Sequence, residues 1–359
     1  MIYSIRLQNY RSYTDTSFEF DNGVNIVVGP NASGKTNLIE AIGVSLRGKS
    51  FRGYDGELVA HDSGWARLDV HLDNQARSVK LQRSQQKIQK TIIIDKQEYK
   101  RLSAQRRYPF VLFEPGDLRL LHGSPERRRE FIDDLLEGVI TDYGSIRRDY
   151  RRTLAQRNAY LKQYYKKANH DDLFVWDVRL SELGSKMVKY RKELLRKIEP
   201  SLQATYQDVA SSKKTIQMNY DSDFPADSYQ DAMLKRLRAG LQRDIELGFT
   251  TTGPHRDDIG LAFDNVPAKQ VASRGETRTV VLALKIIEMQ MLDEAQDKTP
   301  VLLLDDVFSE LDGARRKHLT EHLRRYQTFI TTTDADIVVQ HFMKKCHIIP
   351  LSCASKDVR

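Results

Sequence analysis

The 359-residue chain contains few cysteines, few tryptophans and no long apolar run; it has only two of each of those residues. Cys346 and Cys353 lie near the C-terminus without a partner motif, so a reducing cytosol is the expected location. No apolar stretch approaches the roughly 18 residues that a membrane helix needs. The first residues, MIYSIRLQNYRSY, carry an arginine inside their apolar pattern, which predicts a strand and not a signal peptide. A Cys/His metal cluster, a nucleophilic triad and an internal repeat are also missing from the sequence.

Composition indicates a soluble globular protein with ample core. Hydrophobic residues make up 40% of the chain, charged residues 30%, and the mean hydropathy is −0.55. The length suits about two domains. The net charge is +8, and residues 101–200 hold 22 Lys and Arg against 15 Asp and Glu. This local excess favours a polyanionic partner, although a solvated helical surface explains it equally well.

A phosphate-binding motif follows an early strand. Residues 24–28, VNIVV, are a β-branched run typical of a buried strand, and GPNASGKT is followed by a segment with helical spacing. Strand, glycine-rich loop and helix form the context that the P-loop motif requires, which makes a chance match improbable. We expect the loop N–H groups to face a phosphate, Lys35 to reach the outer phosphates and the Thr36 hydroxyl to bind Mg²⁺. The predicted nucleotide-binding residues of this segment are Gly29, Pro30, Asn31, Ala32, Ser33, Gly34, Lys35, Thr36 and Asn37.

A second buried strand, VLLL, ends in two adjacent carboxylates, Asp305 and Asp306. Like charges this close raise each other's pKa unless a cation lies nearby. We therefore expect Asp305 to hold Mg²⁺ through water and Asp306 to orient or activate the attacking water. The alternative, that both residues cap the next turn, is weaker beside a P-loop.

A second anion site is predicted at the start of a later helix. Ser273 and Glu276 have the spacing of a capping box, and an apolar helix follows them. The exposed helix start offers the serine hydroxyl, the flexible Gly275 and free N–H groups. An ordinary capped helix is the alternative for this segment taken alone.

Together these motifs resemble the ABC-type ATPase heads, in which the P-loop of one subunit and the signature helix of another enclose ATP. Within that class the chain is similar to the RecF family over essentially its whole length. The resemblance implies that Arg11 lies near the nucleotide, although strand packing explains it equally well. It also implies that residues 309–312 line the subunit interface. The γ-phosphate on Lys35 of the partner subunit would be contacted by Ser273, Arg274, Gly275 and Glu276. The matching segments are IRLQNYRSY, GPNASGKTNLIEAI, FEPGDLRLLHGSPERRREFID, TTGPHRDD, ASRGETR, LLLDDVFSELD and TTTD.

The chain departs from these patterns at several functional positions. Glu276 stands where RecF relatives usually have glutamine, and Asp306 stands where they have glutamate. Glu114 is only a weak candidate for the glutamine loop, and Thr332 to Asp334 replace the switch histidine of transporters. These differences predict slow hydrolysis, with ATP acting as a clamp or timer.

The two halves of the predicted site, Lys35 and Asp305, are 270 residues apart, so the head is discontinuous. We expect an α/β fold with residues 1–118 and 214–359 forming an ABC-type ATPase head, namely a P-loop core plus a β-rich section. Residues 119–213 are expected to be an inserted helical arm. On it, a track for duplex phosphates is favoured over a solvated surface. The predicted DNA-binding residues are Arg147, Arg148, Arg151, Arg152, Lys162, Lys166 and Lys167.

The RecF resemblance implies a weak, Mg²⁺-dependent, DNA-stimulated ATPase of DNA repair, replication and recombination. It further implies an ATP-dependent homodimer that binds gaps and duplex–single-strand junctions and helps RecR and RecO to load RecA. A nucleotide-binding subunit of a membrane transporter and a monomeric small-molecule P-loop kinase are the alternatives. The basic arm argues against the first, and the unexplained Ser273–Glu276 segment argues against the second. The HRD within TTGPHRDDIG does not indicate a protein kinase; a structural turn or a contact at the dimer face or between lobes is expected there.

Overall fold

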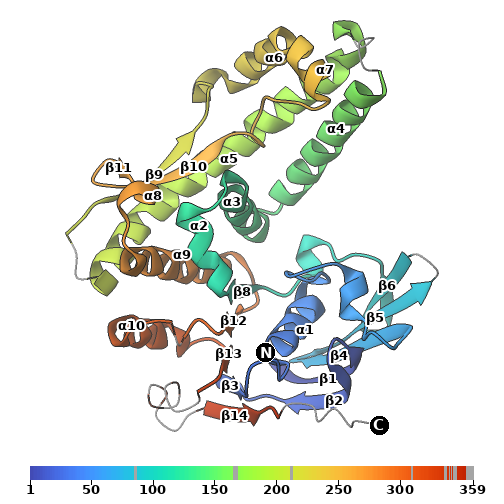
Figure 1. Ribbon diagram of the computed structural model, residues 1–359, viewed down its shortest axis with the longest axis vertical. Helices are drawn as coiled ribbons and strands as arrows, with labels where there is room; N and C mark the ends of the chain where they lie inside the picture. The colour runs from blue at the N-terminus through green and yellow to red at the C-terminus, as the bar shows by residue number, and fades with distance from the viewer. Residues whose placement is uncertain are drawn as a thin grey trace. The chain divides into compact units, whose positions relative to one another are not determined.

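The computed structural model describes residues 1–84, 87–164, 169–210, 213–308, 310–334, 338, 340, 342 and 346–352. The chain divides into two compact units, Met1–Asp117 with Leu284–Arg359, and Leu118–Ala283 (Figure 1). The second unit therefore continues to Ala283, whereas we expected the chain to return to the head at residue 214. The reason is a small sheet after the arm helices, whose strands pair with one another within the second unit.

The first unit contains a five-stranded sheet in which every described pairing is parallel. Strands β12 (Val301–Asp305) and β13 (Thr328–Thr332), near the centre of the sheet, are buried along their whole length. This burial explains their mostly apolar sequences. Since parallel strands end at the same edge, the segments that follow them come together. In spatial order the strands are β14 (Cys346–Pro350), β3 (Val24–Val28), β13 (Thr328–Thr332), β12 (Val301–Asp305) and β8 (Phe110–Phe113).

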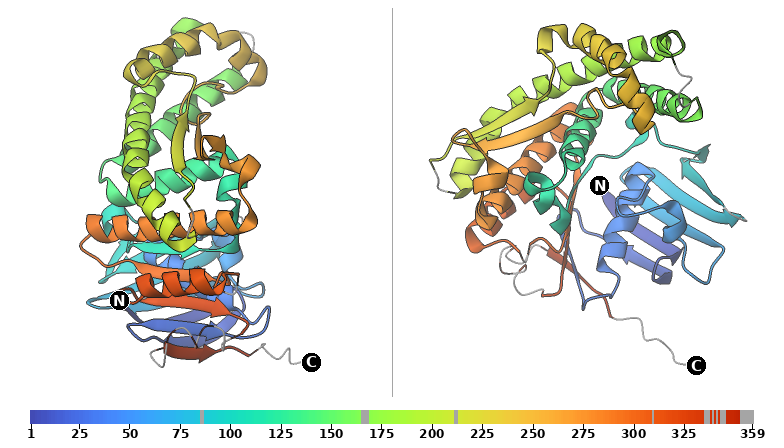
Figure 2. Two further views of the ribbon diagram at one scale, coloured as in Figure 1. Left: turned by 90° about the vertical axis from the view of Figure 1, so that its left-hand side faces the viewer. Right: turned by 45° about the horizontal axis from the view of Figure 1, so that its top comes forward.

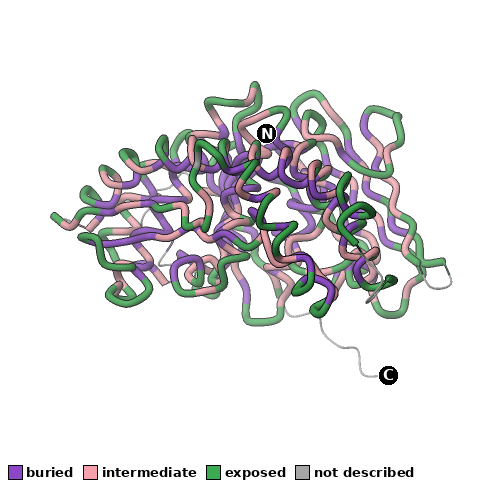
Figure 3. Tube along the Cα trace, turned by 90° about the horizontal axis from the view of Figure 1, so that it is seen from above, coloured by how far each residue is buried: buried purple, intermediate pink, exposed green. Residues whose placement is uncertain are grey.

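A six-stranded antiparallel sheet forms the rest of the first unit's β structure, and its central strands are the predicted β-rich section. Buried residues alternate with more exposed ones along β4 and β5, and Figure 3 shows how burial changes from residue to residue along the chain. Helix α1 (Lys35–Arg47) packs between the two sheets, and its Leu38 and Ile42 share one core with Leu68 and Leu303. The strands are β2 (Tyr13–Glu19), β1 (Ile2–Tyr10), β4 (Trp65–Leu72), β5 (Gln75–Ser84), β6 (Lys87–Ile94) and β7 (Gln97–Tyr99).

The second unit is mainly helical, as expected for the arm. Its long helices α4 and α5 lie side by side (Figure 2), and Pro125 begins α3 at the predicted first-turn position. A three-stranded sheet in the order β11-β10-β9 completes the unit. The elements are α2 (Arg119–His122), α3 (Pro125–Val139), α4 (Tyr143–Gln163), α5 (His170–Ala210), β9 (Ile216–Asp221), α6 (Tyr229–Ala239), α7 (Leu241–Leu247), β10 (Asp258–Phe263), β11 (Val266–Pro267) and α8 (Ala268–Val271).

Helix α9 (Arg274–Ala295) begins in the second unit and ends in the first, which also contains α10 (Gly313–Leu323). The described residues also form four short 3-10 helices: η1 (Asp55–Leu58), η2 (Ala104–Arg106), η3 (Pro115–Leu118) and η4 (Ala226–Ser228). Among the residues described, no helix has both the length and the apolar character needed to cross a membrane.

Candidate nucleotide-binding site

The two predicted metal-binding residues meet at the edge of the parallel sheet. The Thr36 hydroxyl donates a hydrogen bond to Asp305 Oδ1 at 2.9 Å, although the residues are 269 positions apart. Thr331 Oγ1, on the neighbouring strand β13, donates to the same carboxylate oxygen at 2.7 Å. The strand order β3-β13-β12 explains the meeting, because it brings the ends of all three strands to one edge.

The loop between β3 and α1 curls around the ammonium group of Lys35. Lys35 is buried, and its Nζ donates to the carbonyl oxygens of Gly29 and Pro30 at 2.7 and 2.8 Å. Ala32 and Gly34 have the positive φ angles, 65° and 100°, of the left-handed region. A side chain at Gly34 would also meet the Tyr13 hydroxyl, because a Cβ there would lie 2.9 Å from it. The glycine is thus required by both backbone shape and space.

The loop fits an anion such as the triphosphate of a nucleotide. Helix α1 begins immediately after Gly34 without a side-chain cap and without an acidic residue in its first turn, so its first N–H groups are available to a ligand. The buried hydroxyl of Ser33 has no hydrogen-bond partner among the described residues. Mg²⁺ usually takes one or two protein oxygens together with phosphate oxygens and water, and Thr36 and Asp305 can supply such a pair.

Two further carboxylates follow the strands at this edge. Asp306 has a left-handed backbone, with φ 55°, and its N–H donates to Thr331 Oγ1 at 2.9 Å. Leu304 is paired with Phe113, the last residue of β8, so Glu114, which follows that strand, lies at the same edge as Asp305. The sequence offered Glu114 only as a weak candidate, because nothing in its local pattern indicates that β8 is the neighbour of β12.

Arg11 contacts a protein carboxylate. Its guanidinium donates two hydrogen bonds of 2.9 Å to Glu40 of α1, whose side chain is fully buried. Ser50 Oγ donates to the same carboxylate at 2.6 Å. The structure therefore fits the strand-packing interpretation of Arg11, and Glu40 is the residue that sequence reasoning missed. In the sequence, Glu40 stands out as the single acidic residue within the apolar segment LIEAIGV.

The capping box predicted at the start of α9 is confirmed. The N–H of Ser273 donates to Glu276 Oε2 at 2.8 Å, and the N–H of Glu276 donates back to Ser273 Oγ at 3.2 Å. Lys214 Nζ donates to Glu276 Oε1 at 2.5 Å. Hydrogen bonds from Lys214 and then from Ser273 lower the pKa of Glu276 to about 2. Ser273 and Arg274 remain exposed to solvent, whereas the Glu276 carboxylate is committed to the cap.

The segment after β12 prepares the next helix. Asp312 Oδ1 accepts a hydrogen bond of 3.0 Å from the N–H of Arg315, which makes Asp312 the N-cap of α10. Ser309, the first residue of the expected interface segment, lies outside the described residues.

Comparison with known proteins identifies the family. The model of the RecF/RecN/SMC N terminal domain matches residues 1–349. The DNA replication and repair protein RecF of Moorella thermoacetica is 34% identical over 351 residues, covering 97% of this chain and 94% of that protein. RecF of Bacillus cytotoxicus is 32% identical over 365 residues, covering 99% and 98%. The chain belongs to the RecF family.

Solved structures agree with this family assignment. The RecF-ATP structure of the RecFOR pathway superimposes with a TM-score of 0.82 at 28% identity, over 93% of this chain and 92% of that chain. An Smc head bound to the C-winged helix domain of ScpA has a TM-score of 0.54 at 14% identity, over 95% and 91%. The second likeness shows the fold alone. The fold is therefore that of the RecF and SMC ATPase heads, α/β with an inserted helical unit, as expected.

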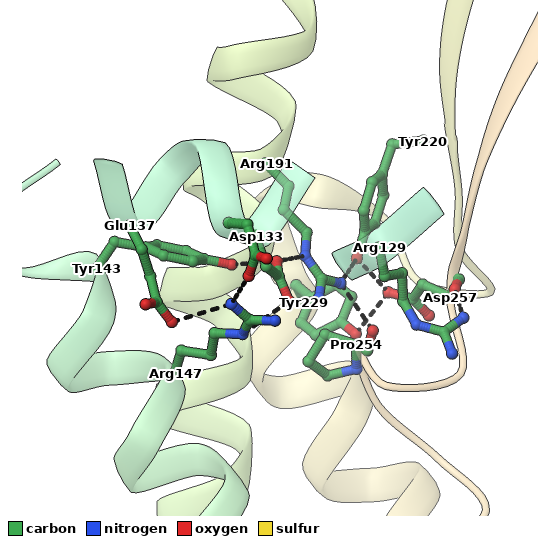
Figure 4. Close-up of polar contacts among 11 residues, drawn as sticks. Arg129, Asp133, Glu137, Tyr143, Arg147, Arg191, Tyr220, Tyr229, Pro254 and Asp257 are labelled. Carbon is green, nitrogen blue, oxygen red and sulfur yellow. Dashed lines mark hydrogen bonds and ion pairs between the residues drawn. The ribbon is translucent and has the colours of Figure 1, made fainter. Parts of the chain in front are cut away.

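One residue of the predicted DNA-binding face is misassigned in this RecF-family arm. The side chain of Arg147 is only 5% exposed, and its guanidinium contacts Asp133 and Glu137 of α3 (Figure 4). It also contacts Asp134 of the same helix. Ion pairs with these acids compensate its charge, so it is a buried structural cation. The acidic run in α3 was the signal that sequence reasoning missed. Arg148, Arg151, Arg152 and Lys162 are exposed, and Lys166 and Lys167 lie outside the described residues.

The TTGPHRDD segment of the RecF family has a structural role within the second unit. Asp257 accepts hydrogen bonds from Tyr220 and Tyr229 at 2.8 and 2.9 Å (Figure 4). His255 Nε2 lies 3.1 Å from the carbonyl of Thr250, and Nδ1 lies 2.7 Å from the Tyr150 hydroxyl. Since a carbonyl only accepts, Nε2 carries the proton and Nδ1 accepts from the tyrosine. This arrangement suits a neutral imidazole.

His255 should make the stability of the second unit pH-dependent. Burial lowers the pKa of His255 to about 4, below its ordinary value, so the unfolded chain binds the proton first as the pH falls. The stability that the neutral His255 contributes is therefore complete above pH about 6.5 and decreases as the pH falls from there to about 4. At pH 5 the loss in the free energy of unfolding is about 2 kcal/mol. Urea unfolding followed by Trp176 fluorescence measures this loss. His255→Gln keeps a donor and an acceptor without titrating, and it should reduce the pH dependence; an unchanged profile would assign the effect to other groups.

Proposed function

We propose that this chain is an ATP-dependent DNA-binding clamp of DNA replication and recombinational repair. ATP·Mg²⁺ brings two copies together, the helical unit binds duplex DNA, and slow hydrolysis releases it. The observation that carries the proposal is the contact between Thr36 and Asp305 beside a loop closed on Lys35. It supports a Mg²⁺–nucleotide site assembled from both ends of the chain.

The residues of the first unit divide the work at the phosphates. The loop from Gly29 to Asn37 would bind them through its N–H groups, and Lys35 would exchange its two carbonyl partners for phosphate oxygens. Thr36 and Asp305 would hold Mg²⁺, which neutralises the phosphate charge. Asp306 would orient the attacking water, and its side chain is one methylene shorter than glutamate, which supports a slow, weak ATPase.

The start of α9 would complete the site from the second copy. Ser273 and Arg274 are exposed and would contact the γ-phosphate, together with the N–H of Gly275. Glu276 would act on the same site indirectly, because its bonds to Ser273 and Lys214 hold the first turn of α9 in place. Arg11 would support α1 through Glu40.

Duplex DNA would lie along the exposed cations of α4, which are Arg148, Arg151, Arg152 and Lys162. Such phosphate contacts would make binding fall steeply with salt and would give it little sequence preference. DNA bound to the clamped dimer would stimulate the ATPase. Relatives are named for DNA replication and repair, and solved RecF structures for the RecFOR pathway. These names support a role in DNA repair alongside RecO and RecR. The clamp would act at gaps and duplex–single-strand junctions and would assist RecA loading.

The test is the solution mass measured by light scattering without nucleotide, with ATP·Mg²⁺, and with ATP·Mg²⁺ plus a duplex oligonucleotide. We expect the mass to double with ATP·Mg²⁺ and the dimer to bind the duplex. A mass that stays at one chain although ATP is bound would contradict the clamp and favour a monomeric P-loop enzyme.

Ser273→Arg should separate nucleotide binding from dimerisation. The larger, charged side chain stands at the exposed start of α9, so ATP affinity should stay within about twofold while the mass remains that of one chain. Ser201→Arg, at an exposed position of α5, is the matched control and should dimerise normally. Normal dimerisation of Ser273→Arg would exclude α9 as the half of the site that comes from the second copy.

A further inference from the structure

The outer face of the six-stranded sheet is open and has no role in the proposed function. On β4, Ala66, Leu68 and Val70 point inward and are at most 1% exposed, because they pack in the core shared with α1. The residues between them point outward, and Trp65 keeps 40% of its surface exposed. The indole of Trp65 is therefore partly accessible on the solvent-facing side of the sheet, where its flat ring is available for stacking.

The strand register arranges the outward side chains in rows. Gln8 of β1 is opposite Arg67 of β4, which is opposite Lys80 of β5, which is opposite Thr91 of β6. In the adjoining row, Trp65 is opposite Gln82, and Gln82 is opposite Gln89. Directly opposite side chains have Cβ atoms about 5 Å apart. All seven residues line one recess of about 500 Å³.

The charges of the recess favour an anion. Arg67 and Lys80 face each other across two strands, an arrangement that is unfavourable without a counter-charge. Arg67 has an ion pair with Asp69 at 2.8 Å. Lys80 is exposed and makes no side-chain hydrogen bond or ion pair with any residue in the described part of the chain. Among the described residues that line the recess, none carries a carboxylate.

We infer that this face binds a single strand of nucleic acid. One base would stack on Trp65, a backbone phosphate would lie between Arg67 and Lys80, and the amides of Gln82 and Gln89 would contact base edges. A duplex keeps its base faces within its own stack and would leave the indole unused, and the carboxylates of an acidic peptide would engage the two cations but also leave the indole unused. The site lies wholly within the first unit and requires no nucleotide.

The test uses Trp65 as its own reporter. The chain has two tryptophans, so in a Trp176→Phe background all tryptophan fluorescence comes from Trp65. Titration with oligo(dT) or oligo(U) in the absence of ATP should quench this fluorescence, and the two oligonucleotides distinguish DNA from RNA. No quenching by either would overturn the inference.

Variants then locate the contacts. With fluorescein-labelled oligonucleotide, Trp65→Ala and Lys80→Glu should each weaken binding about tenfold or more. Lys80→Ala should also lower the slope of log K against log salt by about 0.7. Lys49→Glu, an exposed lysine outside this face, is the control and should bind normally. If Trp65→Ala and Lys80→Glu bind the single-stranded oligonucleotide as tightly as the wild type, the single-strand site is contradicted. It is also contradicted if both variants lose affinity for a duplex oligonucleotide to the same extent. Lys35 does not line the recess, so Lys35→Met should still bind the oligonucleotide. A failure of the clamp proposal can therefore be told apart from a failure of the single-strand site.

Discussion

Replacing Lys35 by methionine is expected to weaken ATP binding about 100-fold or more, the value of a lost charge-assisted contact to phosphate. The Lys35 ammonium lies buried within the loop and bonds the carbonyls of Gly29 and Pro30. Methionine has similar length and no charge, so the phosphates would lose their cation while the loop loses two hydrogen bonds. Titration with a fluorescent ATP analogue in the presence of Mg²⁺ measures the change.

Lys49→Met is the matched control for this loss. Lys49 follows α1, is exposed, and has no side-chain partner among the described residues, so its replacement should leave ATP affinity unchanged. If Lys35→Met binds ATP as tightly as the wild type, the assignment of the loop to a nucleotide is wrong. Equal weakening in both variants would indicate a general charge effect instead.

Replacing Arg191 by methionine is expected to lower the stability of the second unit by about 3–5 kcal/mol, the usual cost of removing one partner of a buried ion pair. Arg191 is 2% exposed and donates two hydrogen bonds to Asp133, at 2.8 and 2.9 Å. It also donates to the carbonyl of Pro254 and to the Tyr220 hydroxyl, at 2.7 and 3.1 Å (Figure 4). One guanidinium of α5 therefore ties together α3, β9 and the loop before β10.

Unfolding in urea can assign this loss to one unit, because Trp65 lies in the first and Trp176 in the second. In a Trp65→Phe background, Arg191→Met should shift the Trp176 transition to lower urea concentration. Arg196→Met changes an exposed arginine on the same helix and should shift it little, since surface changes usually stay within about 0.5 kcal/mol. A similar midpoint for both variants would mean that the buried network adds no stability.

Local patterns predicted the parts of the candidate site that depend on neighbours in sequence. The strand at 24–28 and the helix from Lys35 follow from β-branched residues, a glycine-rich loop and helical spacing, and the structure has both. The box between Ser273 and Glu276 also formed as predicted. Such features form within one or two turns, so their residues need no distant partner.

Local patterns were insufficient where a side chain's partner lies in another secondary-structure element. Arg147 has the sequence context of a surface arginine, and only the packing of α4 on α3 buries it against three acids. Lys214 fixes Glu276 from 62 positions away, and the domain boundary fell at 283 because β9 and β10 pair within the second unit. The acidic run of α3 was a local signal for Arg147, but composition and periodicity do not specify which elements pack against each other.

The RecF family, the P-loop pattern and the acidic strand end could be predicted from the sequence, because each is a contiguous pattern whose chemistry depends on local backbone shape. Which of these residues meet depends on the folded chain. The parallel order β3-β13-β12 joins Thr36 to Asp305, the register of β4 and β5 sets Trp65 and Arg67 beside Lys80, and helix packing removes Arg147 from the surface. The physical reason is that strand order, register and burial are set by the summed packing of the whole core, which no short segment contains.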